Sequence, residues 1–340
     1  MLTILAAGAL AALTLVQQSD TTVAVARGTR LELDNFAGEA VVRTWDRDAV
    51  RVSASHGTRE SIDVQLEAGV LSVSAEGEMG PSGLVDFQLS VPAWMPLELS
   101  GVHSSFTVEG VRGDVEAETV EGFVRVRGGS GLVSLASVQG PVELQGARGR
   151  IEVSSVNESV TVRGSEGDVT AETVNGSVTL EGLRSDRVEA STVNGSITYG
   201  GAIRDEGYYG FETHNGAVTV TMPEGANATV SVSTFQGELE SNLPVRVTGS
   251  RRDGSFSFVL GTGSARVEVE SFQGLMRLIG AGSTAAVRPV PGLEGAHGPR
   301  TPGELRPPLA PRAPRVPRAP RAPRAPQAPR GAPEPAPLPE

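Results

Sequence analysis

The chain of 340 residues contains no cysteine. This excludes a disulfide scaffold, a zinc ribbon, a thiol nucleophile and a lipidated cysteine anchor. It also contains no lysine, so all 29 basic residues are arginine. A lysine Schiff base and a phosphate-binding loop built on Gly-Lys are therefore excluded as well. Aromatic residues make up only 4% of the chain, whereas 42 residues are glycine. The length suits two ordinary domains or one elongated repeat array.

Charge is distributed unevenly along the chain. The net charge is −11, but residues 286–340 carry 9 arginines and 4 glutamates, which leaves −16 on residues 1–285. An acidic body argues against nucleic-acid binding, because phosphate requires a basic face. Only the basic tail is suited to an anionic partner.

The amino terminus predicts export. Residues 2–16 form an uncharged apolar run, which is too short for a transmembrane helix of about 20 residues and fits the hydrophobic region of a signal peptide. We expect residues 1–19 to be a signal peptide or an amino-terminal anchor, and the protein to reach the periplasm, the cell envelope or the cell surface. A buried amino-terminal strand is the alternative.

An internal repeat dominates the rest of the sequence. Four rows of 18 residues follow one another without a gap, and a fifth row starts after 19 residues. Their first residues are Val115, Val133, Ile151, Val169 and Val188. Looser copies begin at Leu31, Leu97, Tyr209, Val230 and Val267. Such regular self-similarity indicates a repeat architecture.

Within each row, apolar and polar residues alternate, as expected of short strands with one buried face. The sixth position of the row is valine in all five rows, and we predict that it forms a buried core column. These residues are Val120, Val138, Val156, Val174 and Val193. A glycine closes each row, where we expect a turn with positive φ. These glycines are Gly128, Gly146, Gly164, Gly182 and Gly201.

One 18-residue unit cannot bury its own apolar face, but copies stacked about 4.8 Å apart can. A hexapeptide helix requires an aliphatic residue at the position of Leu132, where the other rows are mostly charged. Antiparallel hairpins would not explain the common register. We therefore predict an all-β fold, a parallel β-solenoid of about ten coils of roughly 18–21 residues over residues 20–285. The general crossover rule favours a right-handed winding.

Three segments depart from the repeat. Residues 45–92 and 243–262 are predicted to be hairpin insertions that cap or interrupt the stack. Residues 286–340 contain 17 of the 23 prolines, and this Pro/Ala/Arg-rich composition predicts a disordered tail with a polyproline II bias. Arginines recur there every third residue, as possible contacts to an anionic polymer. They are Arg312, Arg315, Arg318, Arg321 and Arg324.

A column of amides is the main candidate site. Stacked amides can hydrogen-bond along a rod, so we predict a structural ladder, with glycan contact as the alternative. Its members are Asn157, Asn175, Asn194 and Asn215. Asp114 and Asp168 share another column but lie three rows apart, too far for a glycosidase pair. The histidines have no metal-ligand spacing. We therefore expect no catalytic residue, no metal and no cofactor.

The segments TVNGSVTL, TVNGSITY and LDNFAGEAVVRTWDRDAVRV resemble the bacterial putative-adhesin β-solenoid family. Its recurring coil is Thr-x-Asn-Gly-x-Val-x-Val, and the resemblance covers roughly residues 21–285. It implies an envelope or extracellular protein with a binding or structural role, and it brings no catalytic residues with it.

These observations favour a non-enzymatic exported envelope protein that acts as an adhesin or scaffold. Its expected partners are an envelope or extracellular polysaccharide or another surface protein. Two alternatives stay open: an enzyme that acts on polysaccharide, and an accessory of envelope-stress sensing or signalling.

Overall fold

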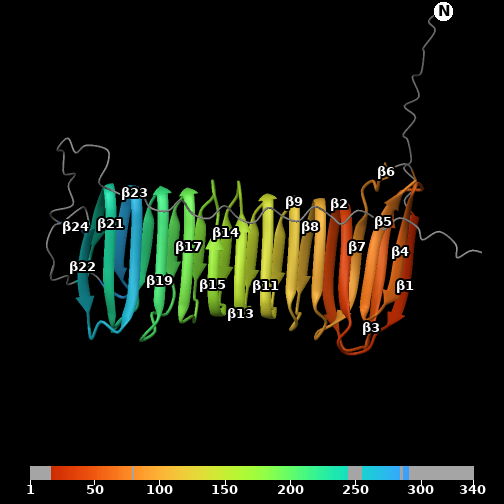
Figure 1. The fold of residues 1–340 in the computed structure, drawn as a ribbon, viewed down its shortest axis with the longest axis horizontal. Helices are drawn as coiled ribbons and strands as arrows, with labels where there is room; N and C mark the ends of the chain where they lie inside the picture. The colour runs from red at the N-terminus through yellow and green to blue at the C-terminus, as the bar shows by residue number, and fades with distance from the viewer. Residues whose placement is uncertain (1–16, 79, 244–254, 284–285, 291–340) are drawn as a thin grey trace, which may run out of the picture.

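The structure is a computed structural model, which describes residues 17–78, 80–243, 255–283 and 286–290. Its strands form one 24-stranded sheet that winds around an elongated rod (Figure 1). No helix occurs in these ranges, and hence none of them provides an apolar helix long enough to cross a membrane. The predicted all-β fold is confirmed.

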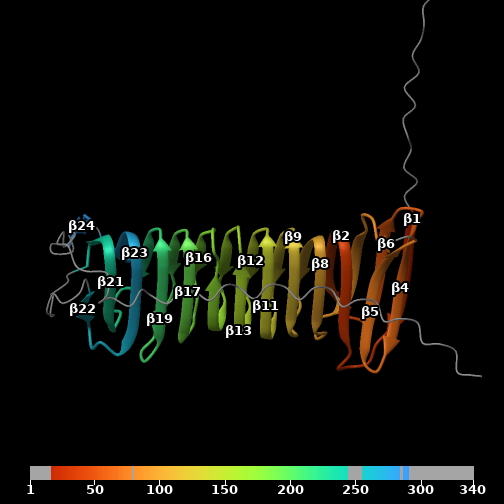
Figure 2. The same cartoon turned by 45° about the horizontal axis from the view of Figure 1, so that its top comes forward.

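A regular coil consists of a first strand, a bend and a shorter second strand. The first strands are β9 (Val115–Glu121), β11 (Ser130–Gln139), β13 (Arg148–Ser155), β15 (Glu166–Glu172), β17 (Arg187–Asn194) and β19 (Tyr208–Asn215). The second strands are β10 (Val124–Arg127), β12 (Val142–Gln145), β14 (Val160–Arg163), β16 (Val178–Glu181), β18 (Ile197–Gly200) and β20 (Val218–Met222). Figure 2 labels β12 and β16 among these second strands.

Successive coils pair in parallel and in the register that the rows predict. Val133 of β11 lies between Val115 of β9 and Ile151 of β13. Val142 of β12 lies in the same way between Val124 and Val160. The first strands therefore build one face of the rod, and the second strands build another.

At both ends of the rod, spatial order departs from sequence order. Four long strands bend to serve both faces: β2 (Arg30–Trp45), β8 (Leu97–Glu109), β21 (Ala228–Ser241) and β23 (Ala265–Gly280). Strand β2 pairs with β8 on one side and with β5 and β7 on the other. Strand β23 pairs with β19 and β20 on one side and with β21 on the other (Figure 1). At the amino end of the rod, the chain runs outward from β2 to β5 and β7 and then returns past β2 to β8. At the carboxyl end, it runs from β20 to β21 and then returns to place β23 between them.

Residues 45–92 are both a coil and a cap. The strands here are β3 (Ala49–His56), β4 (Glu60–Glu67), β5 (Val70–Gly77), β6 (Gly80–Pro81) and β7 (Asp86–Pro92). The expected hairpin is present in β4 and β5, which are antiparallel. However, β5 and β7 also extend the parallel stack on β2.

Antiparallel strands close both ends of the stack, which protects strand edges that would otherwise stay unpaired. At the amino end, β1 (Gln17–Ala24) pairs with β3, so residues 17–19 lie in the sheet. At the carboxyl end, β22 (Ser255–Leu260) and β24 (Arg288–Pro289) pair with β21. The rest of the predicted 243–262 hairpin, residues 244–254, lies outside the described residues.

The core is a set of aliphatic columns along the rod. The first and third row positions and the tenth and twelfth are buried, as Val115, Ala117, Val124 and Val126 show. Near the carboxyl end, larger rings fill the same columns, with Tyr199 5.0 Å from Phe211 between ring centroids. Four of the row-closing glycines have the expected positive φ, whereas Gly201 does not. The four are Gly128, Gly146, Gly164 and Gly182.

The predicted valine core column is wrong. The sixth-position valines are half-buried on the outer side of the bend: Val120, Val138, Val156, Val174 and Val193. The reason is the parity of the strand, because side chains alternate and positions one, three and five all point inward. The fifth position is accordingly a buried hydroxyl column: Thr119, Ser137, Ser155, Thr173, Thr192 and Thr213.

Candidate functional site

The bend between the two strands carries a continuous column of apolar side chains on the rod's surface. Strand register aligns the sixth positions of neighbouring coils. We call this column the apolar stripe, and its members are half-buried or exposed. In spatial order they are Phe36, Val102, Val120, Val138, Val156, Val174, Val193, His214, Phe272 and Phe235.

Stacked rings form the carboxyl end of the apolar stripe. The rings of His214 and Phe272 are parallel within 4°, with centroids 4.6 Å apart. Phe235 continues the stack on the other side of Phe272, at 4.9 Å and 7°. Phe235 ends the stack and is 53% exposed. A contiguous group of exposed apolar side chains is more informative than a single one, and the stacked rings form such a group at this end of the stripe.

The predicted amide ladder is present next to the apolar stripe. Asn175 donates from Nδ2 to Oδ1 of Asn157 at 2.9 Å. Asn194 donates to Asn175 at 3.0 Å, and Asn215 donates to Asn194 at 2.9 Å. Two glutamines extend the column, because Gln273 donates to Gln236 at 3.1 Å.

Each amide in the ladder keeps bonding capacity for a ligand. An amide group has two N–H donors and a carbonyl oxygen with two lone pairs. The ladder uses one donor and one lone pair of Asn175 and of Asn194. These side chains are exposed, so the remaining donor and lone pair are available at the surface.

Internal hydroxyls hold the bend in place. Thr192 Oγ1 donates to the carbonyl oxygen of Gly176 at 2.9 Å, and Thr173 Oγ1 donates to that of Glu158 at 3.0 Å. These carbonyls belong to the eighth position of the preceding coil, where a turn would otherwise leave a buried acceptor unsatisfied. Position five is threonine or serine in all five regular rows of the sequence, so the alternation rule could have found it.

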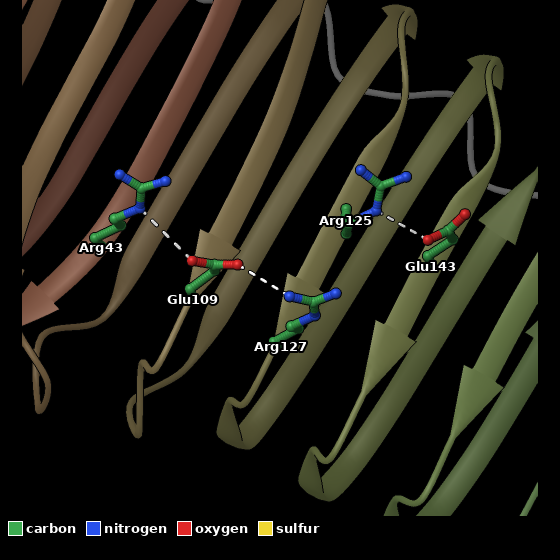
Figure 3. A network of polar contacts seen from close by, with 5 residues as sticks. All are labelled: Arg43, Glu109, Arg125, Arg127 and Glu143. Atoms are coloured by element: carbon green, nitrogen blue, oxygen red, sulfur yellow. Dashed lines mark hydrogen bonds and ion pairs between the residues drawn. The ribbon is translucent and has the colours of Figure 1, made fainter.

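Charged residues on the second face are arranged in pairs across coils (Figure 3). Arg125 Nε donates to Glu143 at 2.9 Å, and Arg127 donates to Glu109 at 3.1 Å. Arg43 lies 3.6 Å from the other oxygen of Glu109. The hydrogen bond from Arg125 lowers the pKa of Glu143. Partly exposed pairs like these contribute little stability each.

The structure does not bring Asp114 and Asp168 together. Asp114 accepts the backbone N–H of Leu132 at 2.9 Å, and Asp168 pairs in register with Arg150, so two coils separate the carboxylates. Glu116 and Glu152 line an open depression beside Leu132, but Arg150 binds Glu152 at 2.8 Å. Within the described ranges, no three acidic or histidine side chains are placed to hold a metal ion.

Acidic side chains are neighbours in adjacent coils at more than one place. Glu98 lies in register between Glu32 and Glu116. Glu212 and Glu270 are register partners in β19 and β23. Burial raises the pKa of the half-buried Glu212, and the charge of Glu270 raises it further. A carboxyl whose pKa is raised by folding destabilises the folded state when it is ionised.

We expect Glu212→Gln to stabilise the protein at pH 8 and to lose this advantage in acid. Between the unfolded and the raised folded pKa of Glu212, the folded state binds more protons, so its stability falls as the pH rises through this window. The gain should be below about 1 kcal/mol, because the site is partly open to solvent. Urea unfolding of both proteins at pH 4 to 8 measures it.

Glu143→Gln is the control with the opposite sign. Its lowered pKa stabilises the folded state above the unfolded value, so this variant should be less stable at pH 8 and should approach the wild type as the pH falls. The same pH trend in both variants would contradict the assignment of Glu212.

Other predicted features lie outside the described residues. These are the apolar run at 2–16 and the tail arginines, together with most of residues 286–340. The tail arginines are Arg312, Arg315, Arg318, Arg321 and Arg324.

Solved structures with low sequence identity are similar to this chain. The chain is similar to a solved putative adhesin from Parabacteroides distasonis ATCC 8503, with 8% identity and a TM-score of 0.41 over 78% of this chain and 97% of that one. It is similar to a putative adhesin from Bacteroides fragilis NCTC 9343, with 10% identity and a TM-score of 0.37 over 77% and 97%. It is also similar to a putative lipid binding protein from Parabacteroides distasonis ATCC 8503, with 7% identity and a TM-score of 0.30 over 76% and 96%.

No curated protein matches the chain. The family model of Toastrack DUF4097, in contrast, matches residues 2–276. Because this match spans most of the sequence, the chain belongs to the Toastrack DUF4097 family.

Proposed function

We propose that this chain is a non-enzymatic, exported envelope protein whose rod acts as an adhesin or scaffold. In this proposal, the rod is a right-handed solenoid of about ten coils, and its partner is an envelope or extracellular polysaccharide or another surface protein. The tail arginines, Arg312 to Arg324, are proposed contacts to an anionic envelope polymer.

The observation that supports a binding role is the repetition of surface columns along one edge. The ladder of Asn157, Asn175, Asn194 and Asn215 presents the same chemistry in successive coils. A surface that repeats at each coil is suited to a partner that also repeats, or to many weak contacts made at once. Membership in the family and the apolar run at 2–16 support export.

Glu212 and Glu270 support the enzymatic alternative, since they are acids in adjacent coils. A glycosidase places its two carboxyl groups on either side of the scissile bond. Both glutamates instead extend from the same face of one sheet, at the fourth row position of their strands. We therefore propose binding without hydrolysis.

The test is where the protein resides and what it does to envelope material. We expect the full chain to fractionate with the envelope of its own cells and to sediment with isolated envelope. We also expect no release of reducing sugars from that material. Cytosolic fractionation would overturn the export proposal. Sugar release that Glu212→Gln abolishes would replace binding by hydrolysis.

A further inference from the structure

We infer that the edge formed by the apolar stripe and the amide ladder binds an uncharged linear polysaccharide that lies along the rod. This inference rests on the proposed binding function and names its ligand class and its site. The two columns occupy adjacent row positions, as Val174 and Asn175 do, so they run side by side along the coils.

The chemistry of the two columns matches that of a sugar chain. A sugar ring has an apolar face of C–H groups and a rim of hydroxyls that both donate and accept hydrogen bonds. The stripe offers valine methyl groups and ring edges to the C–H face. The ladder offers amide N–H groups and carbonyl oxygens to the rim. With coils about 4.8 Å apart, the ten stripe positions extend over about 43 Å.

Charge selects an uncharged polymer over an anionic one. The central members of both columns are valine and asparagine, without ionised groups: Val156, Val174, Val193, Asn157, Asn175 and Asn194. They lie on a body with a net charge of −16, which repels nucleic acids and acidic polysaccharides at long range. An uncharged glycan has no such repulsion to overcome.

The size of the edge disfavours a second copy of the chain. Two adjacent row positions make a ridge about 7 Å wide and about 43 Å long, which covers roughly 300 Å² per partner, whereas a stable dimer usually needs about 800 Å². A peptide that adds a strand needs an open sheet edge. No open sheet edge runs along the stripe through the regular coils, since each first strand there is paired with a neighbour on both sides.

The aromatic end supplies an anchor for one end of the polymer. Phe272 covers one face of Phe235, and the Phe235 side chain is 53% exposed. The outer strands β22 and β24 pair with residues 228–233 and 240–241 of β21, and Val290 donates its backbone N–H to the carbonyl oxygen of Leu239. Strand β23 pairs with residues 234–239 on the inner side, whereas in the described part of the chain no strand pairs with 234–238 on the outer side. The outer face of Phe235 can therefore stack against a sugar ring.

The experiment compares two double variants in native gels cast with dextran, laminarin, xyloglucan or alginate. The stripe variant is Val156→Arg with Val174→Arg. Its matched control, Thr161→Arg with Thr179→Arg, adds the same charge to the same coils on the second face, where both threonines are half-buried. Unchanged thermal melting shows that both variants fold.

We expect at least one of the uncharged polymers to retard the full chain. Because the tail arginines are proposed contacts to an anionic polymer, any retardation in alginate should be lost when residues 291–340 are deleted. The stripe variant should bind at least tenfold more weakly, and the control should bind within twofold of the wild type. Phe235→Ala should weaken binding severalfold through loss of the terminal ring.

The inference is overturned by retardation in alginate alone, by no retardation at all, or by equal losses in the two double variants. If the wild type sediments as a dimer and the stripe variant does not, the edge binds a second copy of the chain. If deletion of residues 291–340 increases binding to the polymers, the edge is occupied by the tail. If the stripe variant still sediments with envelope as the wild type does, the proposed function stands and the stripe is not its site.

Discussion

Replacing Val178 by aspartate is expected to unfold the middle of the rod. Val178 is fully buried and lies in register between Val160 of the preceding coil and Ile197 of the next. A carboxylate at this position has no partner in an aliphatic column, and burying it costs several kcal/mol. Because each coil is stabilised by its neighbours, the loss should spread to the adjacent coils. Circular dichroism melting and limited proteolysis measure it.

Two further variants make this prediction specific. Val178→Ala should lose on the order of 2 kcal/mol through the cavity it leaves. Val174→Asp changes the same residue type in the same coil, but Val174 is half-buried on the apolar stripe, so we expect a loss below about 1 kcal/mol. Similar melting temperatures for Val174→Asp and Val178→Asp would contradict the assigned inner and outer positions.

The repeat predicts strands and register well because both follow from local alternation and a fixed period. Rows that superimpose without a gap place Val115, Val133 and Ile151 in one buried column, as the structure shows. The amide ladder follows from the same register. These features need only the knowledge that each coil stacks on the next.

The valine column lies at the surface because strand geometry, not residue type, decides which face a side chain takes. A column of valine suggests a core, but position six follows the inward position five in the same extended strand. Thr173 points inward to bond the carbonyl of Glu158, so Val174 must point outward. An invariant apolar residue next to a bend can thus belong to the surface.

The order of coils at the carboxyl end could not be predicted from the rows. β21 and β23 both fit the repeat, and nothing in either row determines which one stacks on β19. The structure places β23 there, which puts Phe272 between His214 and Phe235. Sequence order would have separated His214 from Phe272 by Phe235. The aromatic stack is therefore a tertiary feature, formed by the way in which the chain folds back.

Replacing Gly195 by alanine is expected to disrupt the bend edge as severely as a core substitution. A Cβ at this position would lie 1.8 Å from the carbonyl oxygen of Gly176. That oxygen cannot easily move away, because it accepts the hydroxyl hydrogen bond of Thr192. Gly216 approaches Gly195 in the same way in the next coil, at 1.9 Å, so a shift would be passed along the stack. We expect a loss of about 3 kcal/mol.

Gly200→Ala is the matched control for this prediction. Gly200 lies in the same coil, no atom is within 4 Å of its added Cβ, and its φ is not positive, so alanine should change stability by less than about 0.5 kcal/mol. Urea unfolding of both variants measures the difference. The Gly195 variant should also lose more of the glycan binding proposed for this edge, because the shifted bend carries Asn194 out of reach of Asn175. Equal unfolding midpoints for the two alanine variants would show that the coils are less closely stacked at the bend than the 1.8 Å distance from the added Cβ to the Gly176 oxygen implies. The asparagine column would then lack the rigid backbone that aligns it.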